Sequence, residues 1–145
     1  MFMEITRFRC APVVHLGAGA VARLDEEVRR LGGERVALIT DPGVQAAGLV
    51  EQVLRGVTAQ VAVFAGVEPE PPYTLVAQVQ DFIRAHGAQV LIGLGGGSSM
   101  DVAKMAAVMM ANPGTVADYW GVDRVTQRGL PVIAIPTTAG TSSEI

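Results

Sequence analysis

The stretch of sequence that decides the fold is Val90-Leu-Ile-Gly-Leu-Gly-Gly-Gly-Ser-Ser-Met-Asp-Val-Ala-Lys104. Its first five residues, 90–94, form a short apolar run, which is typical of a strand buried in a sheet. Three glycines follow, and from about Ser98 the apolar residues recur at helical spacing. A buried strand that turns sharply into a helix is the repeating unit of a parallel sheet, so this stretch predicts an α/β fold.

Short apolar runs and stretches of helical period alternate along the rest of the chain. Together with the run at 90–94, they predict five strands, at residues 12–16, 35–40, 60–64, 90–94 and 131–135. Four helices are predicted between these strands, over residues 21–31, 42–55, 74–86 and 98–111. The alternation predicts a Rossmann-like parallel sheet with helices on both faces.

Local signals mark where the helices begin and end. Asp41 is expected to cap the helix that begins at Pro42. Glycines are expected to end three helices, at Gly32, Gly56 and Gly87. Two ion pairs at i,i+4 are predicted in the first helix, Asp25–Arg29 and Glu26–Arg30. Three prolines mark residues 67–73 as a loop.

Composition excludes several classes of function. The 145 residues, 50% of them hydrophobic, suffice for one α/β domain with a sizeable core. A formal net charge of -3 and scattered cationic residues do not provide the basic surface that binding to nucleic acid requires. No apolar stretch is long enough to span a bilayer, so no membrane role is expected. A single cysteine, Cys10, and the absence of a signal-type segment predict a cytoplasmic protein without an internal disulfide.

The glycine-rich turn between the central strand and its helix has the chemistry of a phosphate site. At Gly95, Gly96, Gly97 and Ser98 the backbone can approach a ligand closely and point its N–H groups at it. The positive end of the helix dipole adds to the attraction, so a pyrophosphate needs no cationic side chain here. The alternative is a purely structural turn in which Ser98 caps the helix and Asp101 completes an approximate capping box. The triple glycine favours the phosphate interpretation, and the two are compatible.

Two further segments are candidates for nucleotide binding. Gly17-x-Gly19-x-x-Ala22 matches a dinucleotide fingerprint, but a plain glycine-rich turn is favoured because the cradle at 95–98 is the stronger one. Asp41, at the end of the next strand, can accept both hydroxyls of an adenosine ribose and repel a 2'-phosphate, which favours NAD over NADP. Its alternative role is the helix cap. Neither His15 nor His86 has the partners of a metal site, and no catalytic residue is predicted.

Hydroxyl side chains cluster after the last predicted strand. They belong to Thr137, Thr138, Thr141, Ser142 and Ser143. Because this segment leaves a buried strand at its carboxyl end, these groups are expected at the same edge of the sheet as the glycine-rich turn, within reach of a nucleotide. By composition alone, the favoured alternative is a loop whose hydroxyls satisfy their own backbone.

Residues 95–104 and 136–144 closely resemble two signature segments of the iron-containing (group III) alcohol dehydrogenase family, and the likeness extends over essentially the whole chain. The resemblance implies a dehydroquinate synthase-like N-terminal domain that binds NAD. It implies that the pyrophosphate lies on Gly96, Gly97 and Ser98, that Asp101 lies toward the nicotinamide ribose, that Thr137, Thr138 and Thr141 line the dinucleotide, and that Asp41 reads the adenosine ribose.

The chain departs from the family in two respects. Family members commonly have Asn where this chain has Glu70, which leaves open whether this loop contacts substrate or nicotinamide. They also continue into a mostly helical domain whose one Asp and three His bind Fe(II) or Zn(II). Residues 1–145 are therefore expected to be a truncated cofactor domain, inactive alone, with no metal ligands of its own.

The resemblance also implies the activity of the parent protein. That activity is hydride transfer between NAD and a primary or secondary alcohol, with its aldehyde or ketone, and a homodimer is the implied assembly. Two alternatives remain. One is a relative of the glycerol dehydrogenase or maleylacetate reductase type, and the other is a non-catalytic nucleotide-binding module. Asp101, the pair Ser98-Ser99 and the ending Thr-Ser-Ser-Glu favour the alcohol dehydrogenase.

Overall fold

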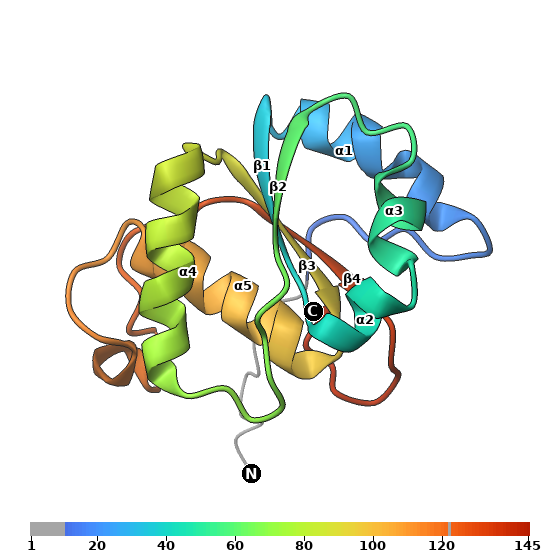
Figure 1. The fold of residues 1–145 in the computed structure, drawn as a ribbon. Coiled ribbons are helices and arrows are strands. Elements are labelled where there is room, and N and C mark those ends of the chain that lie inside the picture. The colour runs from blue at the N-terminus through green and yellow to red at the C-terminus, as the bar shows by residue number, and fades with distance from the viewer. Residues whose placement is uncertain (1–10, 122) are drawn as a thin grey trace, which may run out of the picture.

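The computed structural model describes residues 11–121 and 123–145. Its centre is a four-stranded parallel sheet in the order β2-β1-β3-β4, visible in Figure 1. The strands are β1 (Arg35–Ile39), β2 (Gln60–Phe64), β3 (Val90–Gly95) and β4 (Val132–Pro136). The Rossmann-like parallel sheet predicted from the sequence is confirmed.

Helices cover both faces of this sheet (Figure 1). On one face lie α1 (Leu24–Arg30), which follows the 3₁₀ turn η1 (Ala20–Arg23), α2 (Pro42–Ala46) and α3 (Leu49–Leu54). On the other lie α4 (Tyr73–His86) and α5 (Gly97–Met109), and a second 3₁₀ turn, η2 (Val116–Tyr119), precedes β4. No helix in the described part of the chain is long and apolar enough to cross a membrane.

Two hydrophobic clusters separate along β1 because successive side chains of a strand point to opposite faces. Val36 and Leu38 pack in the cluster beneath α1, α2 and α3, whereas Ala37 and Ile39 pack in the cluster beneath α4 and α5. β3 is buried along its whole length, which explains why its sequence is a continuous apolar run rather than an alternating one. At Gly93 an added Cβ would lie 3.0 Å from Cα of Met100, so glycine here lets α5 lie against the sheet.

The first predicted strand, residues 12–16, is not a strand. This segment is irregular and forms no strand pairing within the described residues. Val14 and Leu16 are 62% and 90% exposed. An apolar run becomes a buried strand only where a neighbouring strand offers it hydrogen bonds and a core face, and neither is present here.

Two details of the predicted helices are also wrong. The helix that begins at Pro42 breaks at Gly48, whose φ of +70° lies in the left-handed region, so α2 and α3 are separate helices. In α1, Arg29 pairs with Asp25 at 3.0 Å as predicted. Glu26 instead pairs with Arg23, and Arg30 with Glu27, both at i,i+3 and 2.7 Å. These exposed pairs contribute little to stability, so their choice of partner depends on local geometry.

The connections out of β1 and β3 run to opposite faces of the sheet. β1 leads into α2 on one face, and its neighbour β3 leads into α5 on the other. The two loops therefore separate at the carboxyl ends of the strands. In open α/β sheets such a switch point leaves a crevice, and ligands bind there.

Candidate functional site

A hollow of about 810 Å³ lies at this switch point, and we call it the carboxyl-edge hollow. Four segments line it, each following the end of a different strand: six residues between 41 and 49 after β1, residues 66–69 after β2, 96–99 after β3 and 137–138 after β4. Its wall includes the apolar side chains of Val44 and Leu49. Among the predicted site residues, those that line the hollow are Asp41, Gly96, Gly97, Ser98, Thr137 and Thr138.

The glycine-rich turn keeps its amide groups available. No protein acceptor takes the backbone N–H of Gly96, Gly97 or Ser98 within the described residues. The N-cap of α5 is Gly96, which has no side chain to compete for these donors. The interpretation in which Ser98 caps the helix is therefore wrong, because Ser98 already lies inside the first turn of α5. Free N–H groups at the start of a 13-residue helix form a site for an anion.

Gly95 does not line the hollow but packs between the turn, Ser99 and Asp41. Its φ of +144° is accessible to glycine and strained for other residues. A Cβ at this position would lie 2.8 Å from Oγ of Ser99 and 2.9 Å from Oδ2 of Asp41. Glycine is therefore required on two grounds, and the same contacts show that Asp41 lies directly against the turn.

Asp41 caps a helix and also lines the carboxyl-edge hollow. Its Oδ1 accepts a hydrogen bond from the N–H of Val44 at 2.9 Å, which confirms the cap of α2. Its Oδ2 lies 3.4 Å from Oγ of the buried Ser99, a long and therefore weak contact. A carboxylate has about four acceptor positions, so Asp41 retains acceptor capacity toward the hollow.

The hydroxyl segment after β4 is tied to the glycine-rich turn. The N–H of Thr137 donates to the carbonyl of Gly95 at 2.9 Å, and Oγ1 of Thr138 lies 3.4 Å from the Cβ position of Gly96. Thr141 instead packs against Gly97, and its Oγ1 accepts from the N–H of Ser143 at 3.3 Å. The hydroxyl of Thr141 therefore bonds to the backbone of its own loop, as the alternative interpretation of this segment expected.

Asp101 lies about one turn into α5 and is exposed rather than part of the lining. Its Oδ2 accepts a hydrogen bond from Oγ of Ser143 at 3.1 Å. This bond joins α5 to the segment that follows β4. Asp101 thus helps to hold the loop that carries Thr137 and Thr138 beside the turn.

The loop after β2 contributes lining residues that we did not assign to the site from the sequence. Residues 66–69 line the hollow, and Val67 is buried. Glu70, next in the chain, is exposed with φ +51°. Asn adopts this left-handed conformation more readily than Glu, so the residue common in the resembling family suits the backbone better. The prolines predicted the loop, but no local signal indicated which strand end it would approach.

The candidate fingerprint at Gly17 and Gly19 is not part of the site. Both residues have positive φ, +133° and +81°, but nothing lies within 4 Å of the Cβ position of either. No strand precedes them from residue 11 onward, where the described part of the chain begins, and neither lines the carboxyl-edge hollow. A dinucleotide fingerprint requires a strand that delivers the turn to a sheet edge, so the plain glycine-rich turn favoured from the sequence describes this segment.

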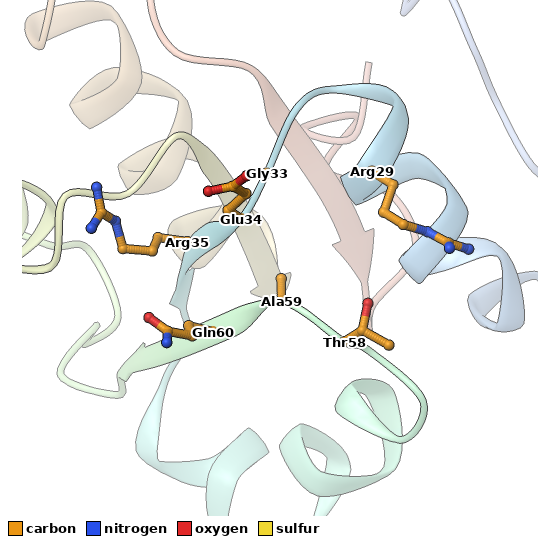
Figure 2. A pocket seen from close by; sticks show the side chains of 7 residues that line it. All are labelled: Arg29, Gly33, Glu34, Arg35, Thr58, Ala59 and Gln60. Atoms are coloured by element: carbon orange, nitrogen blue, oxygen red, sulfur yellow. The ribbon is translucent and has the colours of Figure 1, made fainter.

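A second hollow, of about 540 Å³, lies at the opposite edge of the sheet (Figure 2). Three of its polar residues already bond within the fold: Arg29 pairs with Asp25, Thr58 donates to Asp25 at 2.8 Å from both N–H and Oγ1, and Arg35 donates to the carbonyl of Gly87. The hydrogen bonds from Thr58 hold the pKa of Asp25 below its ordinary value. Figure 2 shows Arg29 and Arg35 extending away from each other, so they form no common anion site.

No group of three or more His, Cys, Asp or Glu residues that could hold a metal ion occurs among residues 11–121 and 123–145. The fold and the hollow define the class of this protein as an open, doubly wound α/β domain with an anion-type turn at its switch point. The family model for iron-containing alcohol dehydrogenase matches residues 11–145. The chain belongs to this family.

Curated relatives and solved structures agree with this membership. The chain is 42% identical to long-chain-alcohol dehydrogenase 1 of Geobacillus thermodenitrificans and 35% identical to NAD-dependent methanol dehydrogenase of Bacillus methanolicus, over 99% and 97% of its length. It resembles the crystal structure of sulfoacetaldehyde reductase from Bifidobacterium kashiwanohense in complex with NAD+, with a TM-score of 0.84 and 30% identity over 98% of its length. The chain spans 38% of the length of each of the two dehydrogenases and 39% of that reductase.

Proposed function

We propose that this chain is the NAD-binding domain of a metal-dependent alcohol dehydrogenase. The observation that carries the proposal is the set of free N–H groups at residues 96–98 on one side of the switch point, with the carboxylate of Asp41 on the other. A dinucleotide offers a diphosphate for the amides and ribose hydroxyls for the carboxylate. The reductase structure with NAD+ and the relative named for NAD dependence support the same cofactor.

In this proposal the chain's own residues bind and orient the cofactor. The amides of 96–98 and the dipole of α5 hold the diphosphate, and Asp41 accepts hydrogen bonds from the adenosine ribose. The apolar side chains of Val44 and Leu49 form a wall suited to an adenine face. Thr137 and Thr138 supply hydroxyls at the far side of the turn. When bound, NAD supplies the hydride acceptor, and the protein's contribution is position and electrostatics.

The rest of the catalytic apparatus is proposed to lie outside this chain. Residues 1–145 correspond to a cofactor domain, and a helical domain with one Asp and three His would hold Fe(II) or Zn(II). A bound divalent ion would supply Lewis-acid polarisation of the alcohol oxygen. The proposed substrates are primary or secondary alcohols with their aldehydes or ketones. We also propose a homodimeric, cytoplasmic protein, and light scattering on the whole protein would test its assembly.

Calorimetric titration of this chain with NAD, ADP-ribose and NADP tests the cofactor assignment. We expect NAD and ADP-ribose to bind with similar dissociation constants, and NADP to bind at least about tenfold more weakly because its 2'-phosphate meets Asp41. The matched variants are Gly96→Asp and Gly96→Ala. Gly96 has φ -77° and ψ -172°, which any residue adopts, and its Cβ position has only Thr138 nearby.

Gly96→Asp places a carboxylate at the N-cap of α5. There it accepts hydrogen bonds from the free N–H groups and repels a phosphate. The variant is expected to be at least as stable as the wild type, because Asp is a preferred cap, and to lose ADP-ribose binding. Gly96→Ala should bind nearly as well as the wild type. If the wild-type chain does not bind ADP-ribose, or if Gly96→Asp binds it normally, the proposal is refuted.

A further inference from the structure

Thr40, between β1 and Asp41, is a polar residue with no exposed surface. Three of its polar atoms make hydrogen bonds. Its N–H donates to the carbonyl of Phe64 at 2.9 Å, its carbonyl accepts from the N–H of Val67 at 3.1 Å, and its Oγ1 donates to the carbonyl of Leu94 at 2.7 Å. Two of these bonds reach the end of β2 and the loop directly after it, and the third reaches β3, all at the carboxyl edge of the sheet.

Two of these bonds reach segments that line or adjoin the carboxyl-edge hollow. Val67 belongs to the loop after β2, and Leu94 immediately precedes the glycine-rich turn. The following residue, Asp41, lines the hollow from the other side of the switch point. Thr40 is thus covalently joined to Asp41, which carries the carboxylate, and hydrogen-bonded to Leu94, which precedes the free amides of residues 96–98.

The hydroxyl bond occurs where the backbone ladder between β1 and β3 ends. The last residues paired across these strands are Ile39 and Gly93, after which the two chains turn to opposite faces of the sheet. The bond from Thr40 Oγ1 to the carbonyl of Leu94 spans the next position. A short, fully buried hydrogen bond at the point of divergence limits how far the two chain segments separate.

We propose that Thr40 is a positioning residue for the nucleotide. It contacts no part of the ligand itself, and its hydroxyl sets the separation between Asp41 and the amides of residues 96–98. A ligand that engages both groups at once depends on this separation, whereas a ligand that engages only one does not. The inference rests on the proposed function, because it assumes that ribose and diphosphate occupy these two places.

The test compares three ligands on three variants of this chain. Adenosine carries only the ribose, inorganic pyrophosphate carries only the diphosphate, and ADP-ribose carries both. Thr40→Val removes the hydroxyl and keeps the shape, whereas Thr40→Ser keeps the hydroxyl. Thr58→Val is the control at a distant position, since it removes an exposed hydroxyl bond of 2.8 Å to Asp25 at the opposite end of the sheet. Dissociation constants come from shifts of backbone amide resonances, which detect weak ligands.

We expect Thr40→Val to raise the dissociation constant for ADP-ribose about tenfold, equivalent to about 1.4 kcal/mol, with adenosine and pyrophosphate changed by less than about twofold. Thr40→Ser should restore ADP-ribose binding, and Thr58→Val should bind all three ligands like the wild type. If Thr40→Val does not fold, Thr40→Ala beside Thr40→Ser provides the same comparison.

Two results would overturn the inference while leaving the proposed function in place. One is wild-type affinity for ADP-ribose in the variant without the hydroxyl, and the other is an equal loss for all three ligands, which indicates general damage to the site. A wild-type chain that does not bind ADP-ribose would instead refute the proposed function.

Discussion

Replacing Gly95 with alanine should damage both the fold and the nucleotide site. The backbone at Gly95 has φ +144°, a conformation that costs a residue with a side chain about 1–3 kcal/mol. The added Cβ would also lie 2.8 Å from Oγ of Ser99 and 2.9 Å from Oδ2 of Asp41. Displacing these well-packed neighbours costs about 1–3 kcal/mol more. We therefore expect Gly95→Ala to lower the free energy of unfolding by about 2–6 kcal/mol.

Gly17→Ala is the matched control for this substitution. Gly17 has a similar φ of +133°, but nothing lies within 4 Å of its Cβ position and the residue is exposed. Only the backbone strain remains here, and because the exposed segment can relax, the expected loss lies at the lower end of its range, about 1 kcal/mol. The two variants thus share a strained φ and differ in whether the new methyl group meets other atoms.

Urea unfolding at 25 °C measures both free energies, and titration with ADP-ribose measures the site. Gly95→Ala should weaken ADP-ribose at least about tenfold, because it displaces Asp41 and Ser99 beside the free amides. Gly17→Ala should leave ADP-ribose binding unchanged. Equal loss of stability in the two variants would refute the steric argument. A loss of binding in Gly17→Ala would indicate that the segment at Gly17 takes part in nucleotide binding.

Three further outcomes are expected. Asp41→Asn keeps an N-cap side chain but removes the negative charge, so it should improve NADP binding relative to NAD by about tenfold with little change in stability; unchanged discrimination in parallel titrations would contradict the role of the charge. Asp25, whose pKa is held below its ordinary value of 3.8 by hydrogen bonds from Thr58, stabilises the fold above that pH and loses this effect as the pH falls through the lower folded value; Asp25→Asn should therefore lower the urea midpoint at about pH 6 and not at about pH 2, and a pH-independent difference would count against this account. Ile92→Ala, at a fully buried position of β3, should cost about 2–5 kcal/mol, whereas Leu16→Ala should change stability by less than about 0.5 kcal/mol; a large cost at Leu16 would indicate that its segment is buried in solution.

Local chemistry explains which parts of the fold the sequence predicted well. The strands at 35–40 and 90–94 have apolar runs typical of buried strands, and the strand at 60–64 is a half-buried edge strand. The helix at 74–86 has a clear amphipathic period. The start of α2 follows from Asp41 and Pro42 alone, because a cap involves residues three apart. The break at Gly48 was missed because glycine is also tolerated inside helices, at a cost of about 1 kcal/mol.

The residues of the carboxyl-edge hollow were predictable where a backbone feature is encoded locally. Three consecutive glycines after a strand indicated the free amides, and a carboxylate at a strand end indicated Asp41. The contribution of residues 66–69 was not predictable, because it depends on where β2 lies in the sheet. The same holds for Asp101, whose partner Ser143 is 42 residues away.

By itself, the sequence determined the buried strands, the turn with free amides and the family to which the chain belongs, because each of these depends on residues close together in the chain. Only the tertiary structure decided that residues 12–16 are not a strand, that β1 and β3 are neighbours, and that Thr40 bonds to Leu94, 54 residues away. A strand needs a neighbour to satisfy its hydrogen bonds, and that neighbour can be anywhere in the chain. A hollow between diverging strands likewise exists only after distant segments have packed side by side.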